Sequence, residues 1–206
     1  MNPMQTDVQI TPPAAGFHDP VQQSQQAFRV LLDAMARPGR VLELSDECGR
    51  PEGLSPVLAA GLLTLADLDT PVWLGAGFDT DAVKAWLRFH TGAPLAARPD
   101  QAALALLDAA HVPALDSFGL GSDEAPERGA TLLVQAPSLT GAAAMTWRGP
   151  GIRESVTMPF CGLDVALWRQ RAQLASVFPR GLDIYLGCGR QVIGLPRSTT
   201  ISFGEA

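Results

Sequence analysis

Residues 182–195 read LDIYLGCGRQVIGL, and this stretch decides the fold. Two apolar runs, residues 182–186 and 191–195, flank the glycine-rich segment 187–190, and each run has the length of a short strand. Isoleucine, tyrosine and valine favour strands, whereas Gly187 and Gly189 favour a tight turn. The stretch therefore predicts a β-hairpin, which adds an antiparallel strand pair to any sheet that it joins.

Upstream of the hairpin, the first helical signal begins at Asp19. Aspartate followed by Pro20 is typical of a helix start, and Pro38-Gly39 ends the segment. Apolar residues recur between these signals at helical spacing and predict one buried face, made of Val21, Phe28, Leu31, Leu32 and Met35. We expect a short strand over residues 40–44 directly after this helix.

Two further helices are predicted in the first half of the chain. Ser55-Pro56 repeats the start signal, and apolar residues on and off the main stripe predict burial on more than one side of that helix. Asp79 is expected to cap a third helix that ends at Thr91-Gly92. The apolar face of this third helix consists of Val83, Trp86, Leu87 and His90.

Strands fill much of the remaining sequence. Residues 71–74, 130–135 and 143–147 favour strands, and residues 163–175 favour a helix. Residues 102–107 are ambiguous, because alanine and leucine suit a helix whereas the short length suits a strand. Helices with short strands early and strands later indicate an α/β fold, with a mixed sheet covered by helices.

Composition excludes several classes of protein. Of the 206 residues, 47% are hydrophobic and 17% are charged, which gives ample apolar area for a folded core. The formal net charge is −6 and no basic stripe is present, so nucleic-acid binding is disfavoured. A chain with so few charges often covers part of its surface with a partner.

The organisation of the chain is simple. Residues 1–17 are polar and proline-rich and predict a flexible N-terminal arm, and residues 18–206 predict a single domain. The arm lacks the basic start and apolar core of a signal peptide, and no run of about 18 apolar residues predicts a membrane span. Cys48, Cys161 and Cys188 are widely spaced, which indicates reduced thiols. We therefore expect a cytoplasmic protein.

Lys84 is the only lysine in the sequence. Pyridoxal phosphate would need it for a Schiff base, but Lys84 falls on the polar side of the third helix, where an ordinary surface lysine is the simpler interpretation. No glycine-rich phosphate loop with G-K-[ST] is present. Any phosphate group would have to be bound by arginines or helix starts instead.

Two regions supply candidate polar residues. Arg148 and Arg153 flank a glycine-rich turn that a ligand could approach closely, although a plain hairpin turn with exposed arginines is the more ordinary interpretation. On the first helix, Gln22, Gln25 and Arg29 follow one flank beside the apolar face. Such a flank can line a cleft or a subunit contact, or can be an ordinary helix boundary.

His90 is a further candidate, on the apolar face of the third helix. A lone histidine there is usually a core residue with one satisfied ring nitrogen. No histidine or cysteine lies three or four residues away, so the spacing of a helical metal site is missing and we expect no metal.

Several stretches together resemble one known family. They are VQxxQxxFRxLLxAM at 21–35, LTLxDxDTPVWL at 63–74, LRFHTGAP at 87–94, GATL at 129–132, GPGI at 149–152, FPxGxD at 178–183 and PRxT at 196–199. In order and spacing they resemble the H subunit of bacterial carbon–phosphorus lyase, from about Asp19 to Thr200. Arg197, in the last stretch, joins the candidate cleft or interface residues.

The resemblance implies a subunit of a core complex that also holds G, I and J subunits. In that family, G, H and I act with an L subunit to join a phosphonate to the ribose of ATP with loss of adenine, and J performs the later cleavage. The resemblance also implies a fold similar to the large pyridoxal-phosphate-dependent transferases, without the cofactor. ATP and the phosphonate are then handled by the whole complex, and the isolated chain is expected to be a homodimer.

Three hypotheses follow. The first is a subunit that supports this ribose-triphosphate transfer and does not catalyse it alone. The second is an independent enzyme whose site is built from Arg29, His90 and Arg148. The third is a purely structural assembly subunit with no ligand site.

Overall fold

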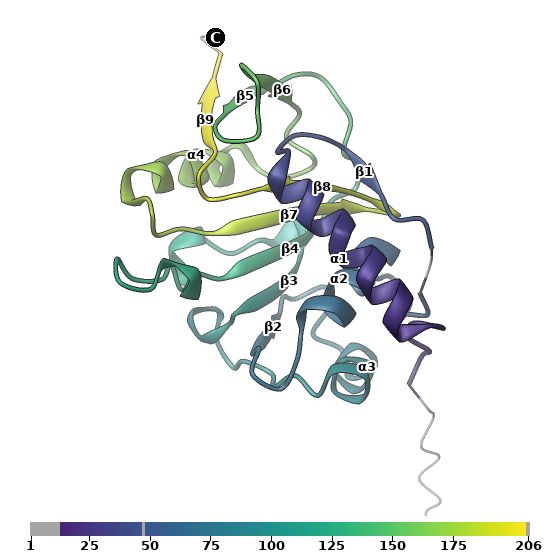
Figure 1. Ribbon diagram of the computed structural model, residues 1–206. Coiled ribbons are helices and arrows are strands. Elements are labelled where there is room, and N and C mark those ends of the chain that lie inside the picture. The colour runs from purple at the N-terminus through teal and green to yellow at the C-terminus, as the bar shows by residue number, and fades with distance from the viewer. Residues whose placement is uncertain (1–12, 47, 205–206) are drawn as a thin grey trace, which may run out of the picture.

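The computed structural model describes residues 13–46 and 48–204 as one α/β fold (Figure 1). The helices are α1 (Pro20–Ala36), α2 (Pro56–Leu65), α3 (Asp81–Thr91) and α4 (Val165–Gln173). The strands are β1 (Leu42–Glu43), β2 (Val72–Leu74), β3 (Leu104–Asp108), β4 (Thr131–Gln135), β5 (Met145–Arg148), β6 (Val156–Met158), β7 (Asp183–Cys188), β8 (Gln191–Leu195) and β9 (Thr200–Phe203). Short 3₁₀ turns lie at Pro99–Gln101, Ala109–His111, Leu115–Ser117, Pro126–Arg128 and Leu174–Val177.

The main sheet is mixed, as the sequence predicts. Its strand order is β1-β8-β7-β4-β3-β2; β2, β3, β4 and β7 run parallel, and β8 and β1 pair antiparallel to their neighbours. The predicted hairpin is β7–β8, but its loop is shorter than expected. Cys188 pairs with Gln191, so Gly189 and Arg190 alone make the turn, and Gly189 has a φ of 55°. Residues 102–107, left open between strand and helix, form β3.

The central strands are buried on both faces. Along β3, Leu104 and Leu106 belong to one core cluster, whereas Ala105 and Leu107 belong to the other. Strand β4 divides in the same way, because side chains alternate between the two faces of a strand. A sheet of this kind needs a cover on each side.

Helices α1, α2 and α3 cover one face of the sheet (Figure 1). The buried face of α1 consists of Ala27, Leu31 and Ala34, and the predicted Met35 is partly buried against the same core, so the prediction is confirmed for Leu31 and Met35 only. Of the predicted residues, Val21, Phe28 and Leu32 are exposed by 81%, 48% and 56%. Small alanine side chains let α1 lie directly on β8, and the larger apolar residues are left on the outside.

The contact between α1 and the hairpin is close. A Cβ atom on Gly194 of β8 would lie 2.5 Å from the backbone of Ala34, so only glycine fits there. One strand away, the buried Tyr185 hydroxyl donates to the carbonyl of Leu31, 3.2 Å away, and burial raises the pKa of this phenol to about 12. These contacts join elements separated by about 150 residues of chain.

A smaller sheet and α4 cover the other face (Figure 1). This three-stranded antiparallel sheet has the order β6-β5-β9. The sequence predicts β5 but neither β6 nor β9, because strands of three and four residues are too short for the alternation of apolar and polar residues to stand out. Trp147 on β5 and Trp168 on α4 lie with ring centroids 5.9 Å apart and fill the centre of this layer.

The helix ends follow the predicted signals with one exception. Asp19 caps α1 by accepting from the N–H of Gln22, and Gly92 ends α3 in the left-handed conformation. The cap of α3 is Thr80, whose hydroxyl accepts from Val83 N–H, and the prediction of Asp79 is therefore wrong. Asp79 lies one residue too early, and its carboxylate instead pairs with Lys84.

The described part of the predicted N-terminal arm, residues 13–17, lies along α3. Trp86 Nε1 donates to the carbonyl of Ala15, and His90 Nε2 lies 2.9 Å from the carbonyl oxygen of Ala14. Gly49 N–H donates to the carbonyl of Gly16 from the opposite side. Residues 1–12 fall outside the described residues.

The three cysteines are free, as predicted, and burial raises the pKa of the Cys161 thiol to about 11. Within the described residues, no helix combines the length and the apolar character needed to cross a bilayer.

Gly194→Ala should destabilise the protein by about 1–3 kcal/mol, because the added methyl group overlaps the backbone of α1. Urea unfolding monitored by circular dichroism measures this change. Gly204→Ala is the matched control, since a Cβ there meets nothing within 4 Å. Equal unfolding midpoints for the two variants would contradict the close contact between α1 and β8.

Candidate functional site

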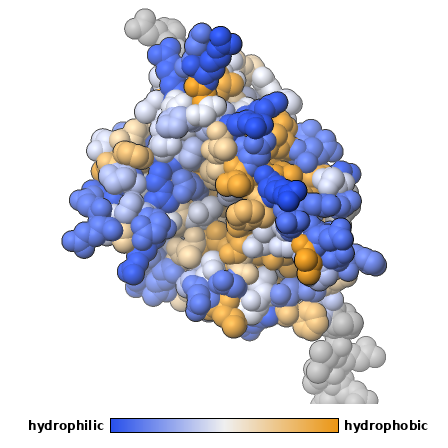
Figure 2. Space-filling view, viewed as in Figure 1, coloured by the Kyte–Doolittle hydropathy of each residue, from blue (hydrophilic) through white to orange (hydrophobic). Residues whose placement is uncertain are grey.

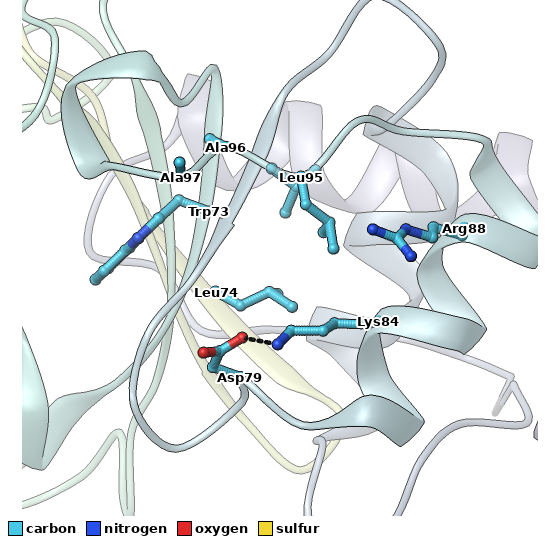
Figure 3. Close-up of a pocket in the computed structure, with 9 residues that line it drawn as sticks. Trp73, Leu74, Asp79, Lys84, Arg88, Leu95, Ala96 and Ala97 are labelled. Carbon is cyan, nitrogen blue, oxygen red and sulfur yellow. Dashed lines mark ion pairs between the residues drawn. The ribbon is translucent and has the colours of Figure 1, made fainter.

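A pocket of about 310 Å³ lies between α3 and the edge strand β2 (Figure 3). Its walls come from β2, from α3 and from the segment after α3, and they are lined by Val72, Trp73, Leu74, Asp79, Lys84, Arg88, Leu95, Ala96 and Ala97. Apolar side chains and three charged groups therefore share one small space. This combination is typical of a site for a small polar ligand.

Helix α3 places the two cations of the pocket. Its buried face, with Val83, Trp86 and Leu87, packs against the core and fixes the rotation of the helix. Lys84 and Arg88 are four residues apart and so extend from the same side of the helix. Figure 3 shows both side chains reaching into the pocket.

The two cations differ in their partners. Lys84 Nζ lies 2.6 Å from Asp79 Oδ1, and the lysine side chain is 33% exposed. Within residues 13–46 and 48–204, the Arg88 guanidinium has neither a hydrogen bond nor an ion pair. The pocket therefore carries one net positive charge, located on Arg88. The sequence analysis interpreted Lys84 as an ordinary surface lysine, whereas the structure places it in the wall of a pocket and in an ion pair.

The backbone adds a further polar group. On the outer edge of β2, Val72 N–H donates to the carbonyl of Pro94, and Ala96 N–H donates to the carbonyl of Val72. Because backbone groups alternate along a strand, the N–H of Leu74 points to this same edge. The paired segment reaches only Ala96, so the Leu74 end of the edge lies beside the pocket.

A second, larger depression of about 690 Å³ lies where β4 ends, next to the start of α2. Two of its polar side chains, Gln135 and Arg50, have partners within the fold, whereas the buried Ser55 hydroxyl has none among the described residues. Gln135 accepts from the N–H of Ser55 and donates to the carbonyl of Gly53, and Arg50 donates to the carbonyls of Leu54 and Cys48. These contacts hold the loop before α2 in place.

The candidates on α1 do not form a cleft with the other predicted residues. Gln22, Gln25 and Arg29 are exposed, and Arg29 borders a shallow depression shared with Asp33 and Glu43. His90 is engaged with the carbonyl of Ala14 and with the rings of Trp86 and Phe89. It holds the N-terminal segment and does not face the pocket.

Arg148 lies on β5, which Figure 1 places at the opposite end of the molecule from α3. The site suggested for an independent enzyme, built from Arg29, His90 and Arg148, is therefore not assembled in this fold. The reason is topological, because α3 covers the β2 edge of the main sheet whereas β5 belongs to the separate small sheet.

The structure does bring the glycine-rich turn next to Arg197. Pro150 of the turn and Arg197 share a shallow pocket with Phe178, while Arg148 and Arg153 are exposed at the two ends of the turn. The guanidinium of Arg197 is fully used, since it pairs with Asp183 and donates to the carbonyl of Pro126. Arg197 therefore connects strand β7 to the segment before β9.

Arg171 is a buried residue that the sequence does not single out. It is 1% exposed, and its Nη2 donates to the carbonyls of Pro196 and Thr199. Burial lowers its pKa to about 10, so it stays protonated at neutral pH. Together with Arg197 it holds residues 196–199 in place, although its buried Nε and Nη1 have no partner among the described residues.

Asp79, Lys84 and Arg88 are the site residues that sequence reasoning missed. A signal was present, because a lysine and an arginine four residues apart follow a predicted strand and Asp79, which the sequence analysis assigned to the helix cap instead. The described residues contain no cluster of three or more potential metal ligands. What the pocket can do chemically is bind an anion.

Asp183→Asn should destabilise the protein by about 2 kcal/mol, because the carboxylate accepts from the N–H, Nε and Nη2 of Arg197 at 2.7, 3.0 and 2.6 Å. The pair is largely buried, with side chains 25% and 14% exposed. Asp100→Asn breaks the exposed pair with Arg98 and should change stability by less than about 0.5 kcal/mol. Equal losses in urea unfolding would show that the Arg197 pair has no structural role.

Comparison with known proteins identifies the family. The family described as "Bacterial phosphonate metabolism protein (PhnH)" matches residues 15–202. The chain is 37% identical over 189 residues to "Alpha-D-ribose 1-methylphosphonate 5-triphosphate synthase subunit PhnH" of Rhizobium meliloti (strain 1021), covering 91% of this chain and 94% of that protein. It is 32% identical over 187 residues to "Putative C-P lyase subunit protein HtxG" of Stutzerimonas stutzeri, covering 88% and 87%. The chain therefore belongs to the PhnH family of bacterial phosphonate metabolism proteins, which is the family that its sequence motifs resemble.

Proposed function

We propose that this chain is a subunit of a carbon–phosphorus lyase complex, in which it supports the transfer of ribose triphosphate from ATP to a phosphonate. The observation that carries the proposal is the 37% identity to a synthase subunit over 91% of the chain. In this proposal the partners are the G, I and J subunits, with an L subunit for the transfer step. ATP and the phosphonate are handled by the whole complex, and this chain needs no cofactor.

The surface of α1 supports a role in assembly. Val21, Phe28 and Leu32 fall within about 40° of one another around the helix and extend over about 16 Å of its length. All three are exposed, and Figure 2 shows hydrophobic side chains gathered among hydrophilic ones on this face of the molecule. Large exposed apolar residues in one stripe are typical of a protein contact.

The proposal assigns this stripe to subunit contacts. The isolated chain is a homodimer in this account, and in the complex a partner subunit takes over part of the contact. The proposal also includes cytoplasmic location and a likeness to the large pyridoxal-phosphate-dependent transferases. The mixed sheet between two covering layers supports that likeness at the level of architecture.

The alternative is a purely structural assembly subunit with no ligand site. The exposed stripe on α1 supports this alternative as well, because a subunit that acts only in assembly needs a contact surface and no pocket. The charged pocket beside α3 favours the leading proposal. The two accounts agree on the partners and differ in whether this chain contacts a ligand.

The function is tested by reconstituting the complex with and without this chain. We expect adenine release from ATP and methylphosphonate only when this chain is present with its partner subunits. The chain alone should give none, because its proposed role depends on the partners. Turnover by the isolated chain, or full activity of a complex that lacks it, would reject the proposal.

Leu32→Glu tests the contact surface separately. A charge at the C-terminal end of the stripe should convert the isolated homodimer to a monomer, which light scattering after gel filtration measures. Val165→Glu is the control, because Val165 is an exposed apolar residue at the start of α4, away from the stripe. Loss of dimer in both variants, or in neither, would place the contact elsewhere.

A further inference from the structure

We propose that the pocket between α3 and β2 binds a phosphorus oxyanion, with Arg88 as its principal ligand, and that the natural occupant is a small alkylphosphonate. The oxyanion site follows from the geometry of the pocket. The choice of a phosphonate over a phosphate rests on the proposed function and on the apolar walls.

Arg88 supplies the recognition. Its guanidinium reaches into the pocket (Figure 3). The side chain is exposed and has no hydrogen bond or ion pair within the described residues. A guanidinium presents two parallel N–H donors that match two oxygens of a phosphonate or phosphate. An unpaired arginine aimed into a cavity is therefore available for such a ligand without breaking an existing contact.

Lys84 and Asp79 tune the charge of the site. The lysine is held by Asp79 at 2.6 Å, so its charge is balanced when the pocket is empty. An anion beside Arg88 would lie next to the ammonium group as well, because residues 84 and 88 are neighbours on the helix. Asp79 thus limits affinity, and removing its charge should strengthen anion binding.

The strand edge adds a neutral donor. The Leu74 N–H points to the open edge of β2, beyond the last residue that pairs with that edge. Backbone N–H groups are common ligands of oxyanions. The pocket therefore offers a guanidinium and an ammonium from α3 and a peptide N–H from the edge of β2.

The size and the walls of the pocket select the ligand. A volume of about 310 Å³ is at the small end of ligand sites, so the pocket suits a compact molecule and not a whole nucleotide. Leu74 and Leu95 form apolar walls beside the cations. A carbon substituent on phosphorus would pack against these walls, whereas inorganic phosphate would leave a hydroxyl or oxide there.

The inference is tested by calorimetric titration of the full chain at low ionic strength with methylphosphonate and with inorganic phosphate. We expect methylphosphonate to bind more tightly than phosphate, in the range of about 0.1–10 mM that few contacts allow. No heat from either anion would overturn the site. Equal or tighter binding of phosphate would overturn the assignment of a phosphonate.

Variants locate the binding in this pocket. Arg88→Gln should weaken binding by about tenfold or more. Arg88→Lys should retain only part of the affinity, because lysine keeps the charge but lacks the two parallel N–H donors of the guanidinium. Asp79→Asn should tighten binding by about threefold, and this gain is not explained by misfolding. Arg169→Gln, which changes an exposed arginine on α4, is the matched control and should leave binding unchanged.

Unchanged affinity in Arg88→Gln, or weaker binding in Asp79→Asn, would exclude this pocket. As an independent measurement, the amide resonance of Leu74 should shift on titration, and a constant Leu74 signal would contradict the proposed geometry. The test is separate from that of the proposed function. If the isolated chain binds no anion in this pocket, subunit assembly and adenine release by the reconstituted complex still test the proposed function. If the complex releases adenine without this chain, anion binding by the isolated chain still tests the pocket.

Discussion

Burial of both faces of β3, β4 and β7 is the constraint on which the rest of the structure depends. Apolar side chains alternate across these strands and leave no face that water could cover without a large loss of free energy. Three helices therefore cover one side, and α4 with a second sheet covers the other. The close fit of α1 on Gly194 is possible because α1 turns alanines toward the sheet.

This packing decides what remains for function. Because the small residues of α1 pack against the sheet, Val21, Phe28 and Leu32 lie on the outside of the helix. There they form a surface suited to another subunit. Arg171 and Arg197 lie in the connection between the two layers, where Asp183 pairs with Arg197 and the carbonyls of Pro196 and Thr199 accept from Nη2 of Arg171.

The pocket beside α3 arises from the edge of the same sheet. Strand β2 has β3 on one side and only a short paired segment on the other, so part of its edge stays open. Helix α3 packs against the core through Val83, Trp86 and Leu87, and this rotation directs Lys84 and Arg88 toward the open edge. A cationic site thus results from core packing and strand termination together.

The sequence by itself determined the family, the mixed α/β class, the hairpin and the position of most helices, because these depend on local signals such as Asp19-Pro20, Thr91-Gly92 and residues 187–190. It could not determine which side of α1 is buried, since apolar periodicity is similar for the inner alanines and the outer Val21, Phe28 and Leu32. It also missed the short strands β6 and β9, which are stabilised by pairing with β5 and not by their own composition. Only the tertiary structure separated His90 from Arg148, because their elements are distant in the chain and belong to different parts of the fold. It also directed Lys84 and Arg88 toward β2, because the rotation of α3 is set by the packing of Val83, Trp86 and Leu87 against the core and not by local sequence.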